Sequence, residues 1–151
     1  MGSGMSSVHI YQAEKKDFQD VFDLLINFKE VDLVDVDLPK VDKPKLKAFI
    51  DFILQKGKII LVKELDQQEL IGCCIFHKSE YWFSKQELIN INILYIKKQY
   101  RNFKLVKTLI DSVKNVADDL PIVMGVTTKI EIGAVLEKLG FENMGGNWRL
   151  A

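Results

Sequence analysis

The strongest constraint on the fold lies between Asn90 and Lys107, where an apolar run leads through a short basic turn into an amphipathic helix. The run N-I-N-I-L-Y-I is typical of a buried strand, and apolar residues at helical spacing from Leu105 predict the helix. A helix that begins directly after a strand presents several unpaired backbone N–H groups in one direction. With the positive end of the helix dipole, these donors form a ready site for phosphate.

Five cations surround this predicted phosphate site in a chain whose formal net charge is zero: Lys97, Lys98, Arg101, Lys104 and Lys107. A solvated basic start of a helix would show the same charges, so the pattern alone leaves both interpretations open. Nucleic-acid binding is disfavoured, because a dedicated binder carries a basic excess and this chain balances 21 basic against 21 acidic residues.

The remaining composition indicates one ordinary globular domain. A chain of 151 residues, 48% hydrophobic and 28% charged, can bury a sizeable core. No apolar run is long enough to span a bilayer and no secretion signal is visible, so we expect a cytoplasmic protein. Cys73 and Cys74 are expected to be reduced thiols, and no Cys/His spacing predicts a metal site. We expect residues 1–7, including a cloning remnant at Met1–Gly4, to be disordered and residues 8–151 to form a single domain.

Hydrophobic periodicity predicts the element order β-α-α-β-β-β-α-β-α-β, a mixed α/β fold of the α+β kind with a late βαβ unit. The predicted strands are Val8–Gln12, Lys58–Glu64, Leu70–Lys78, Leu88–Ile96, Pro121–Thr127 and Phe141–Leu150. The predicted helices are Phe18–Phe28, Leu46–Leu54, Leu105–Val116 and Ile132–Leu139. A hairpin turn is predicted at Asp66-Gln67-Gln68.

Glycine and proline mark where these elements should end. Gly57 and Gly140 each follow a predicted helix, where a left-handed C-cap would end it. Pro39 and Pro44 interrupt the aspartate-rich segment Val31–Pro44, which we expect to be a loop. Its aspartate spacing lacks the glycine and the distal glutamate of an EF-hand, so calcium binding is not predicted.

With these residues in place, the chain resembles the GNAT superfamily of acyl-CoA-dependent N-acyltransferases from about Val8 to Leu150. Family members read L-Y-V-x-P-x-Y-R-G-x-G-I-G-x-x-L where this chain has Leu94-Tyr95-Ile96, Gln99-Tyr100-Arg101 and residues 102–109. They read L-Y-E-K-L-G-F where it has V-L-E-K-L-G-F at 135–141. The tail at 145–148 is similar to the last strand of some phage-encoded members. The resemblance implies a mixed central sheet of about six or seven strands flanked by about four helices.

The resemblance also implies an enzyme that moves an acetyl group from acetyl-CoA to an amine of a small molecule or a protein. The turn and the helix dipole would hold the cofactor's pyrophosphate, and the strand edge Tyr95–Lys97 would pair with its pantetheine arm. The implied cofactor-binding residues are Tyr95, Ile96, Lys97, Arg101, Asn102, Phe103, Lys104, Leu105, Val106 and Lys107. Homodimers are common in this superfamily.

Three departures from the family pattern bear on activity. Asn102, Lys104 and Val106 replace turn glycines, which let the backbone approach phosphate closely. Asn102 tolerates the positive φ that glycine adopts, and Lys104 either pairs with phosphate or fills its site. Leu136 stands where many members carry a tyrosine that protonates the departing sulfur. Asn90 stands near the position of a glutamate base in several members.

The candidate catalytic residues are therefore Asn90, which can position a water molecule, and Glu87 and Tyr95, which lie on the same strand. An exposed strand-end charge and a core aromatic are the alternatives for Glu87 and Tyr95. His77 is expected to be exposed on the surface. General acid–base help is worth about 10²–10⁴-fold, so a slow enzyme could lack both family groups. The alternative function is a catalytically inactive relative that binds CoA or a protein partner.

Two further segments could take part in binding. At least one of Tyr81, Trp82 and Phe83 should lie on the surface, lining an acceptor site or a dimer contact, unless the loop folds back over the sheet edge. The acidic segment Asp32–Asp42 lies where family members build the acceptor rim, and its charge would suit a cationic amine. A solvated loop is the alternative for that segment.

Overall fold

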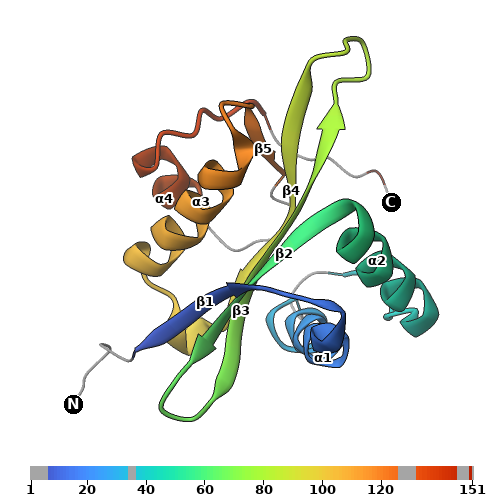
Figure 1. Ribbon diagram of the computed structural model, residues 1–151, viewed down its shortest axis with the longest axis vertical. Helices are drawn as coiled ribbons and strands as arrows, with labels where there is room; N and C mark the ends of the chain where they lie inside the picture. The colour runs from blue at the N-terminus through green and yellow to red at the C-terminus, as the bar shows by residue number, and fades with distance from the viewer. Residues whose placement is uncertain (1–6, 34–36, 126–131, 146–149, 151) are drawn as a thin grey trace.

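The computed structural model describes residues 7–33, 37–125, 132–145 and 150, which form a five-stranded sheet between two layers of helices (Figure 1). The strands follow one another across the sheet in chain order: β1 (Val8–Gln12), β2 (Gly57–Glu64), β3 (Glu69–Glu80), β4 (Glu87–Ile96) and β5 (Ile122–Met124). Neighbouring strands are antiparallel, except that β4 and β5 run parallel. The mixed sheet agrees with the fold class that the sequence predicts.

Helices α1 (Phe18–Asn27) and α2 (Lys43–Lys56) cover one face of the sheet, and α3 (Phe103–Ala117) and α4 (Gly133–Lys138) cover the other (Figure 1). A π-helical stretch, Phe28–Asp32, continues α1, and short 3-10 turns precede α1 and α3. The predicted element order is confirmed through α4. Of the last predicted strand, residues 141–145 are irregular, and 146–149 lie outside the described residues.

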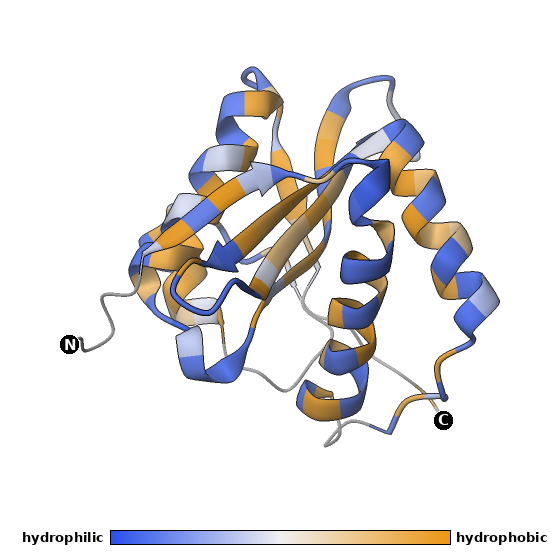
Figure 2. Cartoon of the chain, turned by 60° about the horizontal axis from the view of Figure 1, so that its bottom comes forward, coloured by the Kyte–Doolittle hydropathy of each residue, from blue (hydrophilic) through white to orange (hydrophobic). Residues whose placement is uncertain are grey.

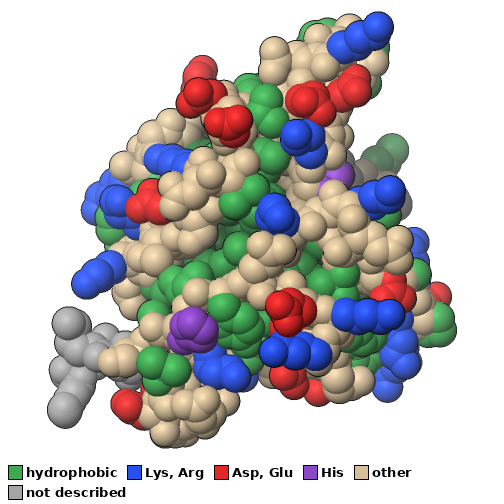
Figure 3. Space-filling model, viewed as in Figure 1, with side chains coloured by type: hydrophobic (Ala, Val, Ile, Leu, Met, Phe, Trp, Pro, Cys, Tyr) green, Lys and Arg blue, Asp and Glu red, His purple; other side chains and the backbone are tan. Residues whose placement is uncertain are grey.

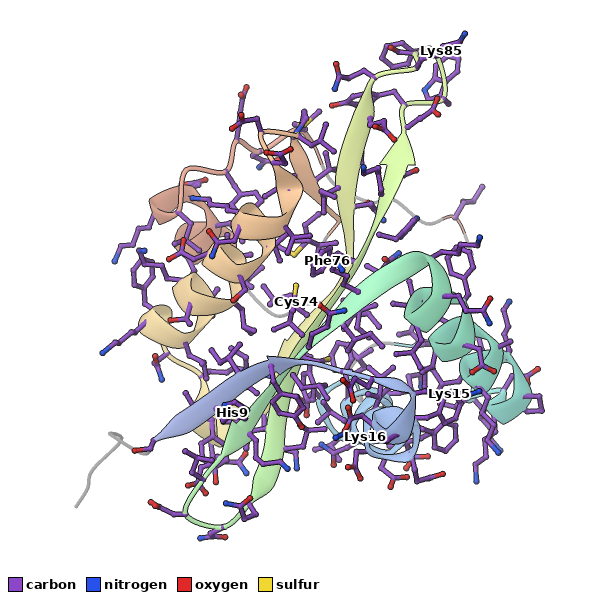
Figure 4. The ribbon with its side chains drawn as sticks, in the orientation of Figure 1. His9, Lys15, Lys16, Cys74, Phe76 and Lys85 are labelled. Atoms are coloured by element: carbon purple, nitrogen blue, oxygen red, sulfur yellow. The ribbon has the colours of Figure 1, made fainter. Side chains whose placement is uncertain are left out.

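Each helix layer buries its apolar stripe against one face of the sheet, so there are two cores (Figure 2). Consecutive strand residues alternate between them, because neighbouring side chains point to opposite faces. Cys73 and Ile75 face α1 and α2, whereas Cys74 and Phe76 face α3 (Figure 4). Both cysteines are free thiols, and burial raises the pKa of Cys73 to about 12.

The two glycines expected to end helices differ in their role. Gly140 has a φ of +94°, and the N–H of the following residue, Phe141, donates to the carbonyl of Leu136, which confirms the left-handed cap. Gly57 has an extended backbone and opens β2, so a left-handed cap was the wrong prediction. A Cβ at this position would collide with the carbonyl oxygen of Phe76. Glycine is needed here because β2 approaches β3 too closely for a side chain.

The segment Val31–Pro44 is only partly the loop that its prolines predict. Its first two residues belong to the π-helical stretch after α1. At its other end, Pro44 lies in the first turn of α2, where a missing N–H costs no intrahelical bond. Asp42 is the N-cap of α2 and accepts a hydrogen bond from the backbone N–H of Lys45 at 3.1 Å.

Strands β3 and β4 form a long hairpin whose tip, carrying Lys85, extends beyond the rest of the sheet (Figures 1 and 4). The described part of β2 begins opposite His77, so the tip has no neighbouring strand on that side. Trp82 is 95% exposed and Phe83 is 69% exposed. The surface position expected for at least one aromatic residue is confirmed, and the loop folded back over the sheet edge was the wrong alternative.

Candidate active site

A β-bulge in β4 marks the start of the site. Phe76 of β3 lies opposite Ile91 and Ile75 lies opposite Ile93, which leaves Asn92 as the extra residue of β4. The parallel pairing of β4 with β5 ends at the same place, with Ile91 opposite Met124. From there to Ile96, β4 has no strand on that side within the described ranges. The open edge of β4 therefore begins at the bulge, three residues before the predicted edge Tyr95–Lys97.

Backbone groups alternate along this edge. The N–H of Lys97 donates to the carbonyl of Ile71 in a bond of 2.8 Å, so the backbone groups of Lys97 point toward β3. Because backbone direction alternates along a strand, the backbone groups of Tyr95 point toward β3 as well. The backbone groups of Leu94 and Ile96 then point to the open side. The Ile96 carbonyl already accepts from Nε of Arg101 at 2.7 Å. Within the predicted edge Tyr95–Lys97, only the backbone groups of Ile96 point to the open side. The N–H and carbonyl of Leu94, which precedes the predicted edge, point to the same side.

The N-terminus of α3 lies at the end of the open edge. Asn102 is the N-cap, and its Oδ1 accepts from the backbone N–H of Leu105 at 2.8 Å. Its φ is −155°, so the positive φ for which asparagine seemed suited is not used. Among the described residues, the N–H groups of Phe103 and Lys104 have no hydrogen-bond partner. Two amides at the positive end of the helix dipole are thus left for an anion.

Three of the five predicted phosphate-binding cations form salt bridges: Arg101 with Asp32 at 2.7 Å, Lys97 with Glu69 at 3.1 Å, and Lys107 with Asp111 at 2.7 Å. The hydrogen bond from Lys107 lowers the pKa of Asp111. Lys98 and Lys104 are exposed and form no salt bridge with any residue that the structure describes. The charge available to a phosphate therefore comes mainly from these two lysines.

Tyr95 is held between β4 and α1. Its hydroxyl accepts from Nδ2 of Asn27 at 2.9 Å, and its ring stacks on Phe28 with 4.4 Å between the ring centroids. Burial, followed by the interaction with Asp32, raises the pKa of Tyr95 to about 12. Tyr95, the candidate acid, therefore already has partners for its hydroxyl, Asn27 of α1 and Asp32 of the stretch after α1. Asp32 also pairs with Arg101, so these residues join α1 to the turn.

The other candidate catalytic residues lie at different distances from the bulge. Glu87 is at the hairpin end of β4, where its carboxylate lies 4.0 Å from Nζ of Lys78. It precedes the bulge residue Asn92 by five positions, about 17 Å along a strand. Asn90 lies close to the bulge, directly opposite His77 of β3.

Sequence reasoning misplaced His77, which we expected on the exposed surface. The side chain is half-buried, and its Nδ1 lies 2.8 Å from Oδ1 of Asn92. Its ring meets the ring of Phe52 of α2 edge-on, with 5.9 Å between the centroids. One available signal was the polar pair Asn90 and Asn92 in an otherwise apolar strand, which indicates a polar position on one face of the sheet.

Helix α4 approaches the start of α3, since Nζ of Lys138 lies 5.6 Å from the ring centroid of Phe103. Leu136 of this helix is buried, and its aliphatic side chain has no proton to donate. The predicted strand from Pro121 is confirmed over Ile122–Met124, and residues 126–131 lie outside the described ranges.

One face of the molecule is apolar in its middle. Figure 3 shows hydrophobic side chains gathered between α3 and the strands, with charged side chains distributed around them. The His, Cys, Asp and Glu residues that the structure describes form no group of three able to hold a metal ion. No described helix has the length and apolar character needed to cross a membrane.

No protein-family model and no curated protein matches the sequence. Solved acetyltransferase structures nevertheless match nearly the whole chain. A GNAT family acetyltransferase from Staphylococcus aureus is 16% identical, with 97% of this chain and 100% of that chain covered and a TM-score of 0.64. A ribosomal-protein-alanine N-acetyltransferase from Brucella melitensis biovar Abortus is 16% identical, with 96% and 99% covered and a TM-score of 0.64.

Glucosamine-6-phosphate N-acetyltransferase from Arabidopsis thaliana is 13% identical, with 96% and 98% of the two chains covered and a TM-score of 0.67. Each of these three matches covers at least 96% of this chain. The chain has the fold of the GNAT acetyltransferases.

Proposed function

We propose that this chain is an N-acetyltransferase that moves an acetyl group from acetyl-CoA to an amine. One observation carries the proposal: β4 is bulged, separates from β5 after Ile91, and leads through a short turn into the capped helix α3. Such an arrangement offers a strand edge to an extended arm and, at the end of that edge, helix amides to a diphosphate. The shared fold of the solved acetyltransferases supports the same use of this edge.

In this proposal, different parts of acetyl-CoA meet different parts of the turn. The backbone groups of Leu94 and Ile96 would pair with the arm, and the N–H groups of Phe103 and Lys104 would bind the diphosphate. The ammonium of Lys104 would add a charged contact. Asn102, Leu105 and Val106 would shape the turn, whereas Lys97, Arg101 and Lys107 would act through their carboxylate partners.

Acetyl-CoA supplies a reactive thioester, so holding the amine beside it provides much of the rate. The chain must also take a proton from the acceptor, and Asn90 cannot do so because an amide does not titrate. The acceptor itself is not fixed by the fold, since the names of two matched enzymes refer to a ribosomal protein and to a sugar phosphate. A reducing, cytoplasmic location fits the free thiols and is part of this proposal.

The test is release of CoA thiol from acetyl-CoA in the presence of small polyamines, amino sugars and peptides with free N-termini or lysines. We expect release above the uncatalysed rate with at least one of these classes. The control is acetyl-CoA with each amine and no protein. Release at the uncatalysed rate with all of them would contradict the proposal.

A catalytically inactive CoA-binding protein is the second candidate. Buried Leu136 and the engaged hydroxyl of Tyr95 favour it, because neither can protonate the departing sulfur readily. Calorimetry with acetyl-CoA separates the two candidates. Binding without turnover would support the inactive form, and absence of binding at millimolar ligand would leave only a protein partner.

A further inference from the structure

Polar side chains gather on one face of the sheet where β4 separates from β5. His77 and Asn90 lie opposite each other in the antiparallel register of β3 and β4, and such partners share a face. Asn92, two residues further along β4, shares this face, as its hydrogen bond with His77 shows. This face belongs to α1 and α2, and Phe52 of α2 contacts the imidazole.

The contact with Asn92 fixes the position of the imidazole hydrogen. Oδ1 of an asparagine can only accept a hydrogen bond, so Nδ1 of His77 must be the donor. The neutral ring then carries its lone pair on Nε2. No residue within the described ranges forms a hydrogen bond with Nε2, so this nitrogen is free to accept a proton.

The backbone around His77 is tightly packed. Gly57 of β2 lies opposite it, and a Cβ on that glycine would come within 2.9 Å of the Cβ of His77. Phe52 restrains the ring from the side of α2. Asn92 restrains it from β4, so elements on three sides hold the imidazole in place.

His77 is flanked in the sequence and in the neighbouring elements by ionisable residues that are exposed or half-buried: Asp51 and Lys56 of α2, Lys58 of β2, Lys78 of β3 and Glu87 of β4. Lys78 and Glu87 form a salt bridge with each other. In the described part of the chain, none of these residues forms a hydrogen bond or a salt bridge with the imidazole. Asn92 is therefore the partner that fixes the state of the ring.

We propose that His77 is the general base of the acetyl transfer and that Asn92 is a positioning residue that fixes its tautomer; this inference rests on the proposed acetyltransferase function. Nε2 takes one proton from the acceptor ammonium group, which frees the lone pair of the nitrogen. An imidazole suits this step because it exchanges protons within the physiological pH range.

The freed nitrogen then forms a bond with the thioester carbonyl carbon. The carbon–sulfur bond breaks, and its electron pair leaves on the sulfur of CoA. The second proton of the attacking nitrogen ends on that sulfur, so the products are an amide and CoA thiol. The imidazolium releases the first proton to water, which restores the base.

The central experiment compares His77→Gln with His9→Gln over a range of pH, using an amine that the unmodified protein acetylates. We expect His77→Gln to lower kcat/KM for the amine by about 10²- to 10⁴-fold while acetyl-CoA affinity, measured by calorimetry, is unchanged. The pH limb that reports the imidazole should disappear. His9 is the matched control, because it lies on β1, stacked on Tyr11, and should leave both readouts unchanged (Figure 4).

Asn92 is tested through the pH profile as well as the rate. Asn92→Ala should lower kcat/KM, because Nδ1–H loses its acceptor. Asn92→Asp should restore the rate, and its charge should move the imidazole limb to higher pH by stabilising the imidazolium. Identical pH profiles for the two variants would overturn the role of Asn92.

A measurement on the unmodified chain keeps the test independent of variant folding. Ring-nitrogen NMR signals of His77 should show the hydrogen on Nδ1 in the neutral form, and the opposite tautomer would overturn the proposal. Turnover by His77→Gln equal to that of His9→Gln would overturn the general base and leave the acetyltransferase proposal standing. No turnover by the unmodified protein would overturn both.

Discussion

The two ends of the open part of β4 use their polar side chains differently. At the turn, Arg101 and Lys97 are paired with carboxylates from other parts of the chain. At the bulge, His77 and Asn92 form a hydrogen bond that leaves one ring nitrogen free among the described residues. Most of the charges that stand out in the sequence are therefore paired within the fold, whereas the proposed proton acceptor lies at the end with little charge.

Burial explains why the turn uses its charges in this way. The carboxylate side chain of Asp32 is only 9% exposed, and a carboxylate in such a position needs a charged or hydrogen-bonding partner. Arg101 supplies that partner and also donates to the Ile96 carbonyl, while the hydroxyl of Tyr95 interacts with the same carboxylate. These contacts tie α1, β4 and the turn together.

The largest expected effect on stability follows from removing Arg101. Arg101→Ala leaves the Asp32 carboxylate without its cation, and we expect the free energy of unfolding to fall by about 1–3 kcal/mol. Urea denaturation measures this loss. Lys98→Ala is the control, because its exposed side chain has no salt bridge with a described residue and should change stability by less than about 0.5 kcal/mol.

The opposite result would assign Arg101 a different role in the turn. An unchanged urea midpoint for Arg101→Ala, together with lost acetyl-CoA binding, would show that the guanidinium serves the cofactor rather than the fold. The contrast between the turn and the bulge would then fail, because both ends would carry functional groups.

A smaller effect is expected at high pH from Tyr95. Its pKa is raised from 10.0 to about 12 in the folded chain, so folding favours the protonated phenol. The stability that this gives is complete below pH 10.0 and is lost as the pH rises through about 12. In Tyr95→Phe, the urea midpoint should fall less steeply across that window. Equal slopes for Tyr95→Phe and the unmodified chain would show that the phenol is not held as described.

The order and type of most elements could be predicted from the sequence, because burial of one face imposes a period of 2 on strands and 3.6 on helices. The errors occur where a local signal has two structural uses. Gly57 is required by the close approach of two strands rather than by a helix end. Pro44 lies in the first turn of a helix, although a proline in the same sequence context can also lie in a loop.

The site was less predictable, because its contacts join distant positions. Arg101 and Asp32 are 69 residues apart in the sequence, and Lys97 and Glu69 are 28 apart. Nothing in the local basic pattern indicates that carboxylates arrive from elsewhere. The contact between His77 and Asn92 joins two strands across 15 positions of the sequence, and the polar residues of β4 do not by themselves indicate that a histidine of β3 lies beside them.

A moderate effect on ligand binding is expected at Lys104, which is exposed at the start of α3. Lys104→Glu replaces a cation with an anion beside the two unpartnered amides, so acetyl-CoA affinity should fall about tenfold, the effect of 1.4 kcal/mol. Calorimetry measures the change. Tighter binding would instead show that the side chain of Lys104 fills the phosphate site, which is the alternative that the sequence left open.

The smallest expected effect comes from Asn102, whose side chain accepts from the Leu105 N–H and would compete with a bound diphosphate for it. Asn102→Gly releases that N–H at a cost of only a few tenths of a kcal/mol in stability. A third free amide should tighten acetyl-CoA binding about threefold, which corresponds to the lower end of the net free energy of one hydrogen bond.

Asn102→Ala releases the same N–H but keeps a Cβ, so it separates the free amide from the closer backbone approach that glycine allows. Tighter binding in both variants would identify the amide as the cause. Tighter binding in Asn102→Gly alone would identify the approach of the backbone. If neither variant binds acetyl-CoA more tightly, the N-cap and the diphosphate do not compete, and the turn would be, like its paired cations, a part of the fold rather than of the cofactor site.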